Sequence, residues 1–554
     1  MASKAEEMAS KQRDISVAEF FEKNRHLLGF DNKRKALLTT IKEAVDNALD
    51  ACEEAEILPE IIIEIIEMSE ERYRVVVEDN GPGIVKAQIA NIFAKLLYGS
   101  KFHKLAQSRG QQGIGISASV LYGQLTTGRP ARIRSKTGPR EDAHYYELYI
   151  DTQTNQPHIY KNEIIEWEKE SGTRIEIDLE GAYMRGSQSV DEYLKETAII
   201  NPHATIIYTN PRAEQFIFAR ASDELPRQPV SIKPHPHGIE LGMLMKMMKS
   251  TQETTIRSFL MNDFSKVGTG TAAEILEKAS VPPRTKVKSI NRDEADRIMQ
   301  AIKSTKIMAP SIDAISPITE ELIERGLKKE INAEFYTAVS RTPAIYRGNP
   351  FAIEVGIAYG GSIPADRSCD ILRFANRVPL LYQQGACIFT SSISKTNWRT
   401  YGLNQSNGSL PQGPLVILVH IASVWVPFTS EAKEAVAHYE EIEKEVKLAL
   451  QEAGRTLGSY VRKKKRVGEE LKKRSYIEAF IPHIAQALIE ILDEDPQMEE
   501  SLTANLQETL EKTRGEIKQV GLTREQNTEY DEKLARFGRG AHDELEEDEV
   551  EEER

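Results

Sequence analysis

The sequence predicts an α+β protein of several domains, in which a layered sandwich, an all-helical insertion and a second α/β domain follow one another. The length supports several domains, because 554 residues are several times the ~100–200 of an ordinary one. The composition is globular, with 40% hydrophobic and 28% charged residues. Strand-like segments near the N-terminus follow one another across hairpin-sized gaps, which indicates an antiparallel sheet covered by helices.

The cysteines and the N-terminus indicate a cytoplasmic protein. Cys52, Cys369 and Cys387 are an odd number at wide spacing, so they predict neither a disulfide framework nor a zinc site. The first residues carry charges where a signal peptide needs an apolar core. No stretch approaches the ~18 apolar residues of a membrane span. We therefore expect no membrane partner.

The net charge of −13 is concentrated at the C-terminus. Residues 543–554 hold nine acidic residues and one basic residue, which predicts a solvated, disordered tail over 541–554. The rest of the chain is much nearer to neutral, so the overall charge does not exclude nucleic acid as a partner. Basic runs at 462–466 and 472–474 fit either a solvated helix face or contacts to phosphates.

The first domain is expected at 31–230, after an N-terminal segment, 1–30, that forms a strap or packs on a neighbour. Apolar periodicity predicts a helix at 33–55 and another after Ser189. Alternating and β-branched runs between them predict strands at 61–68, 72–79, 131–137, 144–150 and 173–180. These elements make a sandwich with an antiparallel sheet rather than a doubly wound parallel sheet.

The remainder of the chain divides into a helical and a second mixed region. The turn-rich Lys-Pro-His-Pro-His-Gly at 233–238 marks the boundary. A long charged helix is expected from Ser430 to about Lys473, followed by helical stretches around Pro482 and Pro496. The apolar face of the long helix is expected to carry Ala435, Val436, Ile442, Val446 and Leu450. The expected regions are 231–325, all-helical; 326–475, α/β with the long helix; and 476–540, helical.

The predicted helix at 33–55 carries the first chemically informative pair. Glu43 and Asn47 are four residues apart, so they project from one helix face. A carboxylate can take a proton from water and an amide oxygen can ligate Mg²⁺, which together suit hydrolysis of a phosphoanhydride. The alternative is an ordinary solvated face, which polar pairs at this spacing mostly are.

A carboxylate followed by two close glycines ends the predicted strand at 72–79. Gly81 and Gly83 let the backbone approach a planar ligand, and Asp79 can accept a hydrogen bond from an exocyclic amine such as adenine N6. Asp-Asn-Gly is also strong turn chemistry, so a hairpin turn is the alternative interpretation.

A glycine-rich stretch then precedes an apolar helical pattern. Backbone N–H groups at the start of such a helix form a cradle for phosphate. Residues 99–109 are polar and flanked by glycine, which suits a mobile lid that closes on a ligand. The candidate residues of this stretch are Ser100, Lys101, Arg109, Gly110, Gln111, Gln112, Gly113, Ile114, Gly115 and Ile116.

Each of these three motifs is weak alone, but their order along the chain is specific. With them the chain resembles the GHKL ATPase superfamily, whose members include gyrase-type topoisomerases, MutL proteins, heat-shock chaperones and histidine kinases. Gly172-Thr173, before a predicted strand, resembles the later Gly-Thr box of that superfamily. The resemblance implies that the first domain is a Bergerat-type ATPase sandwich.

Further motifs narrow this resemblance. They are Tyr-Gly-Ser-Lys-Phe-His at 98–103, Ser-Arg-Gly-Gln-Gln-Gly-Ile-Gly-Ile-Ser-Ala at 108–118, the turn at 233–238, Arg-Phe-Ala-Asn-Arg-Val-Pro-Leu-Leu-Tyr at 373–382 and Asn-Trp-Arg-x-Tyr-Gly-Leu at 397–403. Together they resemble the B subunits of the topoisomerase VI family, archaeal type IIB enzymes. The resemblance spans roughly 15–480 and implies an ATPase domain, a helix-two-turns-helix domain and a transducer domain in that order.

The resemblance implies ATP and Mg²⁺ as cofactors and assigns roles to individual residues. Glu43 is implied as the general base, Asn47 as the Mg²⁺ ligand and Asp79 as the residue that reads adenine. The backbone at Gly81 and Gly83 and the hydroxyl of Thr173 are implied to complete the adenine end, and residues 109–116 with Ser100 and Lys101 to form the phosphate-binding lid.

The same resemblance implies a cation from the transducer domain that touches the γ-phosphate. Arg399 occupies that position, and Lys395 is the second candidate. An arginine keeps the charge and binds phosphate bidentately, although it is not isosteric with lysine.

The implied function is that of the ATP-hydrolysing subunit of an ATP-dependent DNA topoisomerase. ATP-driven homodimerisation would gate passage of one DNA duplex through a double-strand break made by an A subunit, in an A2B2 heterotetramer that relaxes supercoils and decatenates DNA. No tyrosine of this chain needs to be the cleaving nucleophile. The alternative is a nucleotide-switched clamp or chaperone without strand passage, which would lack the helical insert and transducer motifs.

His235 and His237 raise a separate question about metal. They are two residues apart, but no cysteine or further histidine lies near them in the sequence. A structural turn is therefore the favoured interpretation.

Overall fold

The computed structural model describes Lys4, Met8 and residues 14–101, 104–110, 113–430, 432–492, 495 and 498–514. The chain divides into two compact units. The first contains Met1–Trp398 and Leu403–Gly454, and the second contains Arg399–Gly402 and Arg455–Arg554. The expected acidic tail, 541–554, and most of the expected C-terminal helical region after Arg514 lie outside the described residues.

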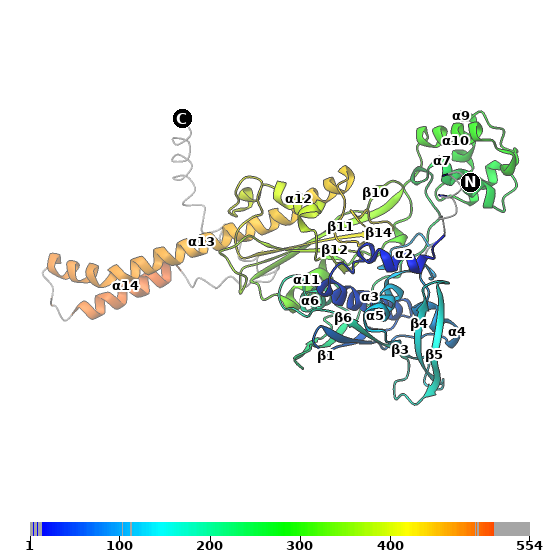
Figure 1. Ribbon diagram of the computed structural model, residues 1–554. Helices are drawn as coiled ribbons and strands as arrows, with labels where there is room; N and C mark the ends of the chain where they lie inside the picture. Colours follow the sequence, from blue (N-terminus) through cyan, green and yellow to red (C-terminus); the bar gives the residue numbers. More distant parts are fainter. Residues whose placement is uncertain are drawn as a thin grey trace. The chain divides into compact units, whose positions relative to one another are not determined.

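An eight-stranded sheet forms the base of the first unit (Figure 1). Its strand order is β5-β4-β3-β6-β2-β1-β7-β8, and every pairing is antiparallel except that of β1 with β7. The predicted antiparallel sheet is therefore confirmed. The strands are β1 Glu60–Ser69, β2 Arg72–Glu78, β3 Ala131–Lys136, β4 Ala143–Asp151, β5 Gln156–Ile165, β6 Gly172–Glu180, β7 Thr205–Thr209 and β8 Gln215–Phe218.

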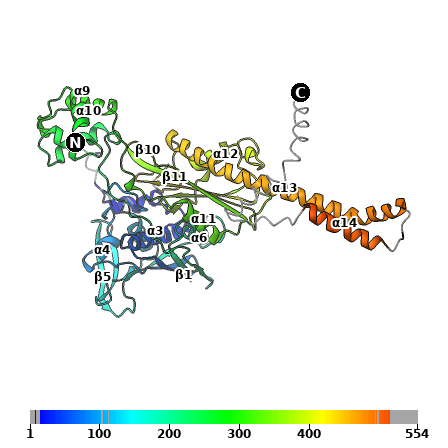
Figure 2. The ribbon, with the colours of Figure 1, turned by 180° about the vertical axis from the view of Figure 1, so that it is seen from behind.

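Helices cover one face of this sheet, as both views show (Figures 1 and 2). The helix α3 begins at Lys33, where the side chain of Asn32 accepts a hydrogen bond from the Lys35 N–H. Its buried side chains recur every three or four residues and face the sheet. The helices of this layer are α2 Val17–Lys23, α3 Lys33–Glu54, α4 Lys86–Ala94, α5 Gly115–Thr127 and α6 Val190–Ile200.

The helical insertion has a core of its own. Its buried residues run from Ile239 to Ile302 and form a separate apolar cluster, as expected for a small folded unit. His235 and His237 lie at its entry and face backbone carbonyls of Met308, Ile302 and Thr305, which confirms the structural turn. The helices are α7 Leu241–Ser250, α8 Ile256–Asn262, α9 Thr269–Lys278 and α10 Arg292–Ser304.

A second, six-stranded sheet follows in the same unit. Its order is β10-β11-β14-β12-β13, with β9 paired to β11, and only β12 and β14 are parallel among the described pairings. The helix α11 packs on it and on α6, and a Cβ at Gly326 would lie 2.0 Å from the Ile199 carbonyl oxygen. Glycine thus permits this close approach of the two layers. The elements are α11 Glu320–Glu330, β9 Phe335–Ser340, β10 Ala344–Tyr346, β11 Asn349–Tyr359, β12 Asp370–Ala375, β13 Val378–Pro379, α12 Ile388–Lys395 and β14 Leu415–Ser423.

The long C-terminal helix differs from the expected one at both ends. The helix α13 spans Glu440–Leu492, so it begins about ten residues later and ends well beyond Lys473. Ala435 and Val436, expected on its apolar face, lie before it; both are buried, and Val436 forms a β-bridge with Phe428. The helix also passes through Pro482, where a separate stretch was expected. A proline removes a backbone hydrogen bond, which this 53-residue helix tolerates.

The described residues after α13 form one further helix. This helix, α14, spans Glu499–Arg514, and Pro496, around which a helix was expected, lies outside the described residues. Six short 3₁₀ segments complete the description: Arg25–Leu28, Pro236–Gly238, Val287–Ser289, Ile312–Ala314, Gln384–Ala386 and Trp398–Tyr401. Among the helices described here, none has a stretch that is both long and apolar enough to cross a bilayer.

Candidate nucleotide-binding site

A cavity of about 910 Å³ opens between the helical layer of the first sheet and the second sheet. Its floor comes from α3, from the segment after β2 and from β6, and its wall from the N-terminal turn of α5. The second sheet contributes residues from two loops, 379–382 and 432–434. Most of the candidate residues named above line this cavity.

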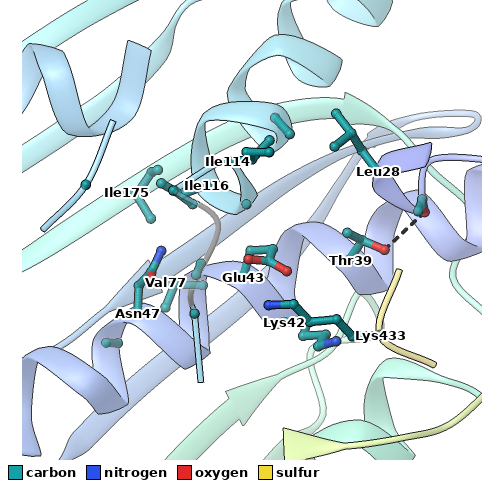
Figure 3. A pocket seen from close by; sticks show the side chains of 18 of the residues that line it. Leu28, Thr39, Lys42, Glu43, Asn47, Val77, Ile114, Ile116, Ile175 and Lys433 are labelled. Atoms are coloured by element: carbon teal, nitrogen blue, oxygen red, sulfur yellow. Dashed lines mark hydrogen bonds between the residues drawn. The ribbon is translucent and has the colours of Figure 1, made fainter. Parts of the chain in front are cut away.

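Glu43 and Asn47 reach the cavity from α3 (Figure 3). The helix places them one turn apart, as the four-residue spacing predicts. A Cβ at Gly115 would lie 1.6 Å from Oε2 of Glu43, so a larger residue at the start of α5 would force this carboxylate to move. The Glu43 carboxylate therefore lies directly against the glycine-rich turn.

Asp79 lies at the other end of the cavity and is held by backbone. Its Oδ1 accepts hydrogen bonds from the N–H of Gly81 at 2.9 Å and of Thr173 at 3.1 Å. Burial raises the pKa of Asp79 to about 6, while these two hydrogen bonds oppose the shift. Because both bonds engage Oδ1, Oδ2 remains for a ligand amine.

Two glycines fix the backbone around this carboxylate. Gly172 has a φ of +140° and its Cβ would lie 2.2 Å from the Asp79 carbonyl oxygen. Gly83 has a φ of +69° and its Cβ would lie 2.0 Å from the Lys136 carbonyl oxygen. The segment runs from β2 into α4, so the alternative of a hairpin turn is wrong. Gly81 shapes the turn without lining the cavity.

The glycine-rich stretch faces the cavity at the start of α5. The N–H groups of the first helical turn have no partner within the helix, so they are available to an anion there. Gln111 and Gln112 lie outside the described residues. The described residues of this stretch that line the cavity are Ser100, Lys101, Gly110, Gly113, Ile114, Gly115 and Ile116, and Thr173 lines its opposite end.

Arg109, in contrast, is buried behind the cavity and does not line it. Its guanidinium donates to Asp50 at 2.7 Å, to both oxygens of Glu53 at 2.7 and 2.8 Å, and to Asn201 at 2.7 Å. Partial burial alone raises the pKa of the Glu53 carboxyl group, but Arg109 and His203 hold it below the usual range. Arg109 thus fastens the base of the expected lid to α3.

Lys101 both lines the cavity and pairs with carboxylates of α3. It lines the cavity, and its ammonium lies 2.6 Å from Asp50 and 2.8 Å from Glu54. Burial alone lowers the pKa of Lys101, but the two carboxylates raise it overall. The side chain is therefore charged near neutral pH.

The base of the expected lid also contacts the second sheet. The Ser108 carbonyl accepts a hydrogen bond from the Asn376 side chain at 3.1 Å, and the Arg377 carbonyl accepts one from Asn201 at 3.3 Å. Asn376 and Arg377 form the turn between β12 and β13. Residues far apart in the sequence thus join the lid base, α3 and the second sheet.

The cations predicted to reach the γ-phosphate are not among the residues that line the cavity. Arg399 belongs to the second compact unit. Lys395 is paired with Glu443 at 2.7 Å. Lys42 and Lys433 line the cavity instead, and Figure 3 shows both near Glu43.

Sequence reasoning missed Lys433 because residues from Ser430 onward were expected to begin the long helix. Lys433 lies instead in a loop before α13, with a φ of +53°. A sequence signal for such a loop was available: the polar segment Thr-Ser-Glu-Ala-Lys, residues 429–433, immediately follows the apolar strand segment. This loop contributes Ala432, Lys433 and Glu434 to the lining of the cavity.

The donor set fits ATP with Mg²⁺. The buried carboxylate of Asp79 suits an adenine amine, and the α5 N-terminus with Lys101 and Lys433 suits phosphates. Among the described residues, no group of three or more histidine, cysteine and acidic side chains forms a metal site. Mg²⁺ is usually held by one or two side chains together with substrate phosphates, and Asn47 is placed for that.

Two family descriptions match this chain. Residues 32–180 match the family described as histidine kinase-, DNA gyrase B- and HSP90-like ATPase. Residues 310–473 match the transducer of the topoisomerase VI B subunit. The first match covers β1 to β6 with α3 to α5, and the second covers β9 to β14 with the first part of α13.

Curated relatives are similar over most of the chain. The B subunit of type 2 DNA topoisomerase 6 from Methanococcoides burtonii is 52% identical over 492 residues, which cover 89% of this chain and 79% of that protein. The protein of the same name from Archaeoglobus fulgidus is 49% identical and covers 88% and 81%. Among solved structures, the 43K ATPase domain of Thermus thermophilus gyrase B has a TM-score of 0.38 at 11% identity, over 83% of this chain and 98% of that one.

Proposed function

The chain belongs to the family of type 2 DNA topoisomerase 6 B subunits, and from this premise we propose how its residues act. It is the ATP-binding and ATP-hydrolysing subunit of a type IIB DNA topoisomerase, and its GHKL ATPase domain is followed by a transducer. The transducer match argues against the chaperone alternative, which would lack that region. Its relatives are archaeal.

We assign the chemical roles from the cavity geometry. Glu43 takes the proton of the attacking water, because its carboxylate faces the glycine-rich turn where phosphates would lie. Asp79 accepts the adenine N6–H, and the N–H groups at the α5 N-terminus bind phosphate oxygens. Mg²⁺, held by Asn47 and phosphate oxygens, would neutralise charge that develops on the transferring phosphoryl group.

The γ-phosphate cation that we propose is Lys433 rather than Arg399 or Lys395. The supporting observation is that Lys433 lines the cavity that also contains Glu43. Lys433→Ala should lower kcat/KM for ATP by about 10- to 100-fold, because a charged hydrogen bond to the transferring group is lost. Arg399→Ala should leave it near the wild-type value. Steady-state hydrolysis by the two variants checks this. A larger loss of kcat/KM in Arg399→Ala than in Lys433→Ala would instead assign the γ-phosphate contact to Arg399.

We propose that ATP closes two copies of this chain around a DNA duplex. The supporting observation is that the second sheet contributes Lys433 and residues 379–382 to the ATP cavity, so bound nucleotide would hold the two sheets together. The segment 1–30 is the candidate strap between copies, and an A subunit in an A2B2 assembly would cut the second duplex. The expected domain boundaries, 31–230, 231–325 and 326–475, belong to this proposal.

Light scattering of the full-length chain tests the gate. We expect the molar mass to double on addition of Mg²⁺ with a non-hydrolysable ATP analogue and to return when both are removed. The Asp79→Asn variant is the control, because it should need about 10- to 100-fold more nucleotide for the same change in mass. An unchanged mass in the wild type, with nucleotide binding demonstrated by calorimetry, would contradict an ATP-driven dimer of this chain alone.

A further inference from the structure

The loop that carries Lys433 is held by its neighbour, Glu434. The Glu434 carboxylate is only 7% exposed. Its Oε1 lies 2.5 Å from the ammonium of Lys35 on α3, and its Oε2 accepts a hydrogen bond from the Gln383 side chain at 2.6 Å. One carboxylate therefore joins the helix of the ATPase layer to two loops of the second sheet.

Lys35 is itself held in a defined place. Its ammonium lies 2.6 Å from Asp31 and 5.5 Å from the centre of the Tyr382 ring. Burial alone lowers the pKa of Lys35, but Asp31 and Glu434 raise it overall, so Lys35 is charged near neutral pH. Lys35 precedes Glu43 by eight residues, about two turns of the same helix.

Contacts other than this ion pair also hold the loop. Ala435 and Val436 are completely buried, and Val436 pairs with Phe428 in a β-bridge. An ion pair of low exposure pays a desolvation cost that its attraction only partly offsets. The contribution that we consider for the Lys35–Glu434 ion pair is therefore the orientation of Lys433, the residue next to Glu434.

We propose that the Lys35–Glu434 ion pair positions Lys433 on the terminal phosphate of ATP. This inference rests on the role proposed for Lys433. It makes Glu434 a positioning residue that acts through Lys433, and it makes the register between α3 and the second sheet a requirement for hydrolysis.

A double-mutant cycle on the full-length chain tests this. Glu434→Gln keeps the shape of the side chain and removes its charge, so it should lower kcat/KM for ATP by about 10- to 100-fold through misplacement of Lys433. In a Lys433→Ala background the same change should have less than about a twofold effect. ADP lacks the terminal phosphate, so its Kd should change by less than about twofold in every variant.

Glu445→Gln is the matched control. Glu445 pairs with Arg341 at 3.3 Å within the second sheet region, and its side chain is 15% exposed. Its loss should leave both hydrolysis and ADP binding unchanged, and thermal melting should show that all variants fold.

The outcomes separate the two hypotheses. Wild-type turnover by Lys433→Ala would overturn the role of Lys433 and this inference with it. A normal defect in Lys433→Ala combined with wild-type turnover by Glu434→Gln, or an additive loss in the double variant, would overturn the inference alone. A weakened ADP affinity in Glu434→Gln would show that the ion pair supports the whole cavity instead.

Discussion

Replacement of Glu43 by glutamine should abolish ATP hydrolysis and leave ATP binding intact. The carboxylate acts as a base only in the chemical step, so kcat should fall by about 10²–10⁴-fold. Glutamine keeps the shape that fits against Gly115, which leaves the cavity undisturbed. Steady-state hydrolysis and calorimetric titration with a non-hydrolysable analogue measure the two properties separately.

The control for this result is Glu67→Gln. Glu67 is an exposed carboxylate on β1 and does not line the cavity, so its loss should change neither turnover nor binding. If the Glu43→Gln variant hydrolyses ATP at the wild-type rate, Glu43 is not the general base. If it loses nucleotide binding as well, its role is in the shape of the cavity.

Asp79→Asn should remove most of the nucleotide affinity while the protein stays folded. Both backbone N–H donors engage Oδ1, so the amide group of asparagine would take the place of Oδ2. That amide donor would then meet the donor amine of adenine, a mismatch worth about a 10- to 100-fold loss of affinity. Calorimetric titration with ADP and with GDP measures the loss and its dependence on the base.

The same change should alter the pH dependence of stability. Burial raises the pKa of Asp79 to about 6 in the folded protein, above its ordinary value of 3.8. The stabilising contribution of the protonated group is complete below the unfolded pKa and is lost as pH rises through about 6. At pH 8 the ionised, buried group costs on the order of 3 kcal/mol, so Asp79→Asn should be more stable there than the wild type.

Asp191→Asn is the control for both measurements. Asp191 accepts hydrogen bonds from Tyr183 at 2.9 Å and Tyr208 at 2.8 Å and does not line the cavity. Its loss should leave nucleotide affinity unchanged. Wild-type affinity in Asp79→Asn would contradict the assignment of the adenine end, and an unchanged pH profile of thermal melting would contradict the raised pKa.

Much of the fold was predictable because its elements are local. The helix at 33–55 was expected within one residue of the observed α3, since its apolar spacing lies in the sequence. The start of α13 was not, because Ala435 and Val436 are apolar but lie in a loop, where Val436 pairs with Phe428 in an isolated β-bridge. Periodicity shows that a residue is buried and not what buries it.

The candidate site likewise has a part that local sequence predicts and a part that depends on contacts between distant residues. Glu43 with Asn47 is a pair within one helix turn, so its arrangement follows from spacing. The contact of Asp79 with Thr173 joins residues 94 positions apart, and sequence alone indicated it only through a family resemblance. Arg109 looked like part of a phosphate lid because it adjoins glycines, yet its side chain faces Asp50 and Glu53.

By itself, the sequence determined that this protein has an ATPase sandwich with its helix-borne carboxylate and amide, a carboxylate before glycines and a glycine-rich helix start. Tertiary structure alone decided which cation enters the cavity, that Gly115 gives room to Glu43, and that Glu434 holds the Lys433 loop against α3. The physical reason is the distance along the sequence over which each kind of interaction acts. Helix spacing and turn chemistry act over a few residues, whereas the cavity is closed by side chains that meet only when two sheets pack together.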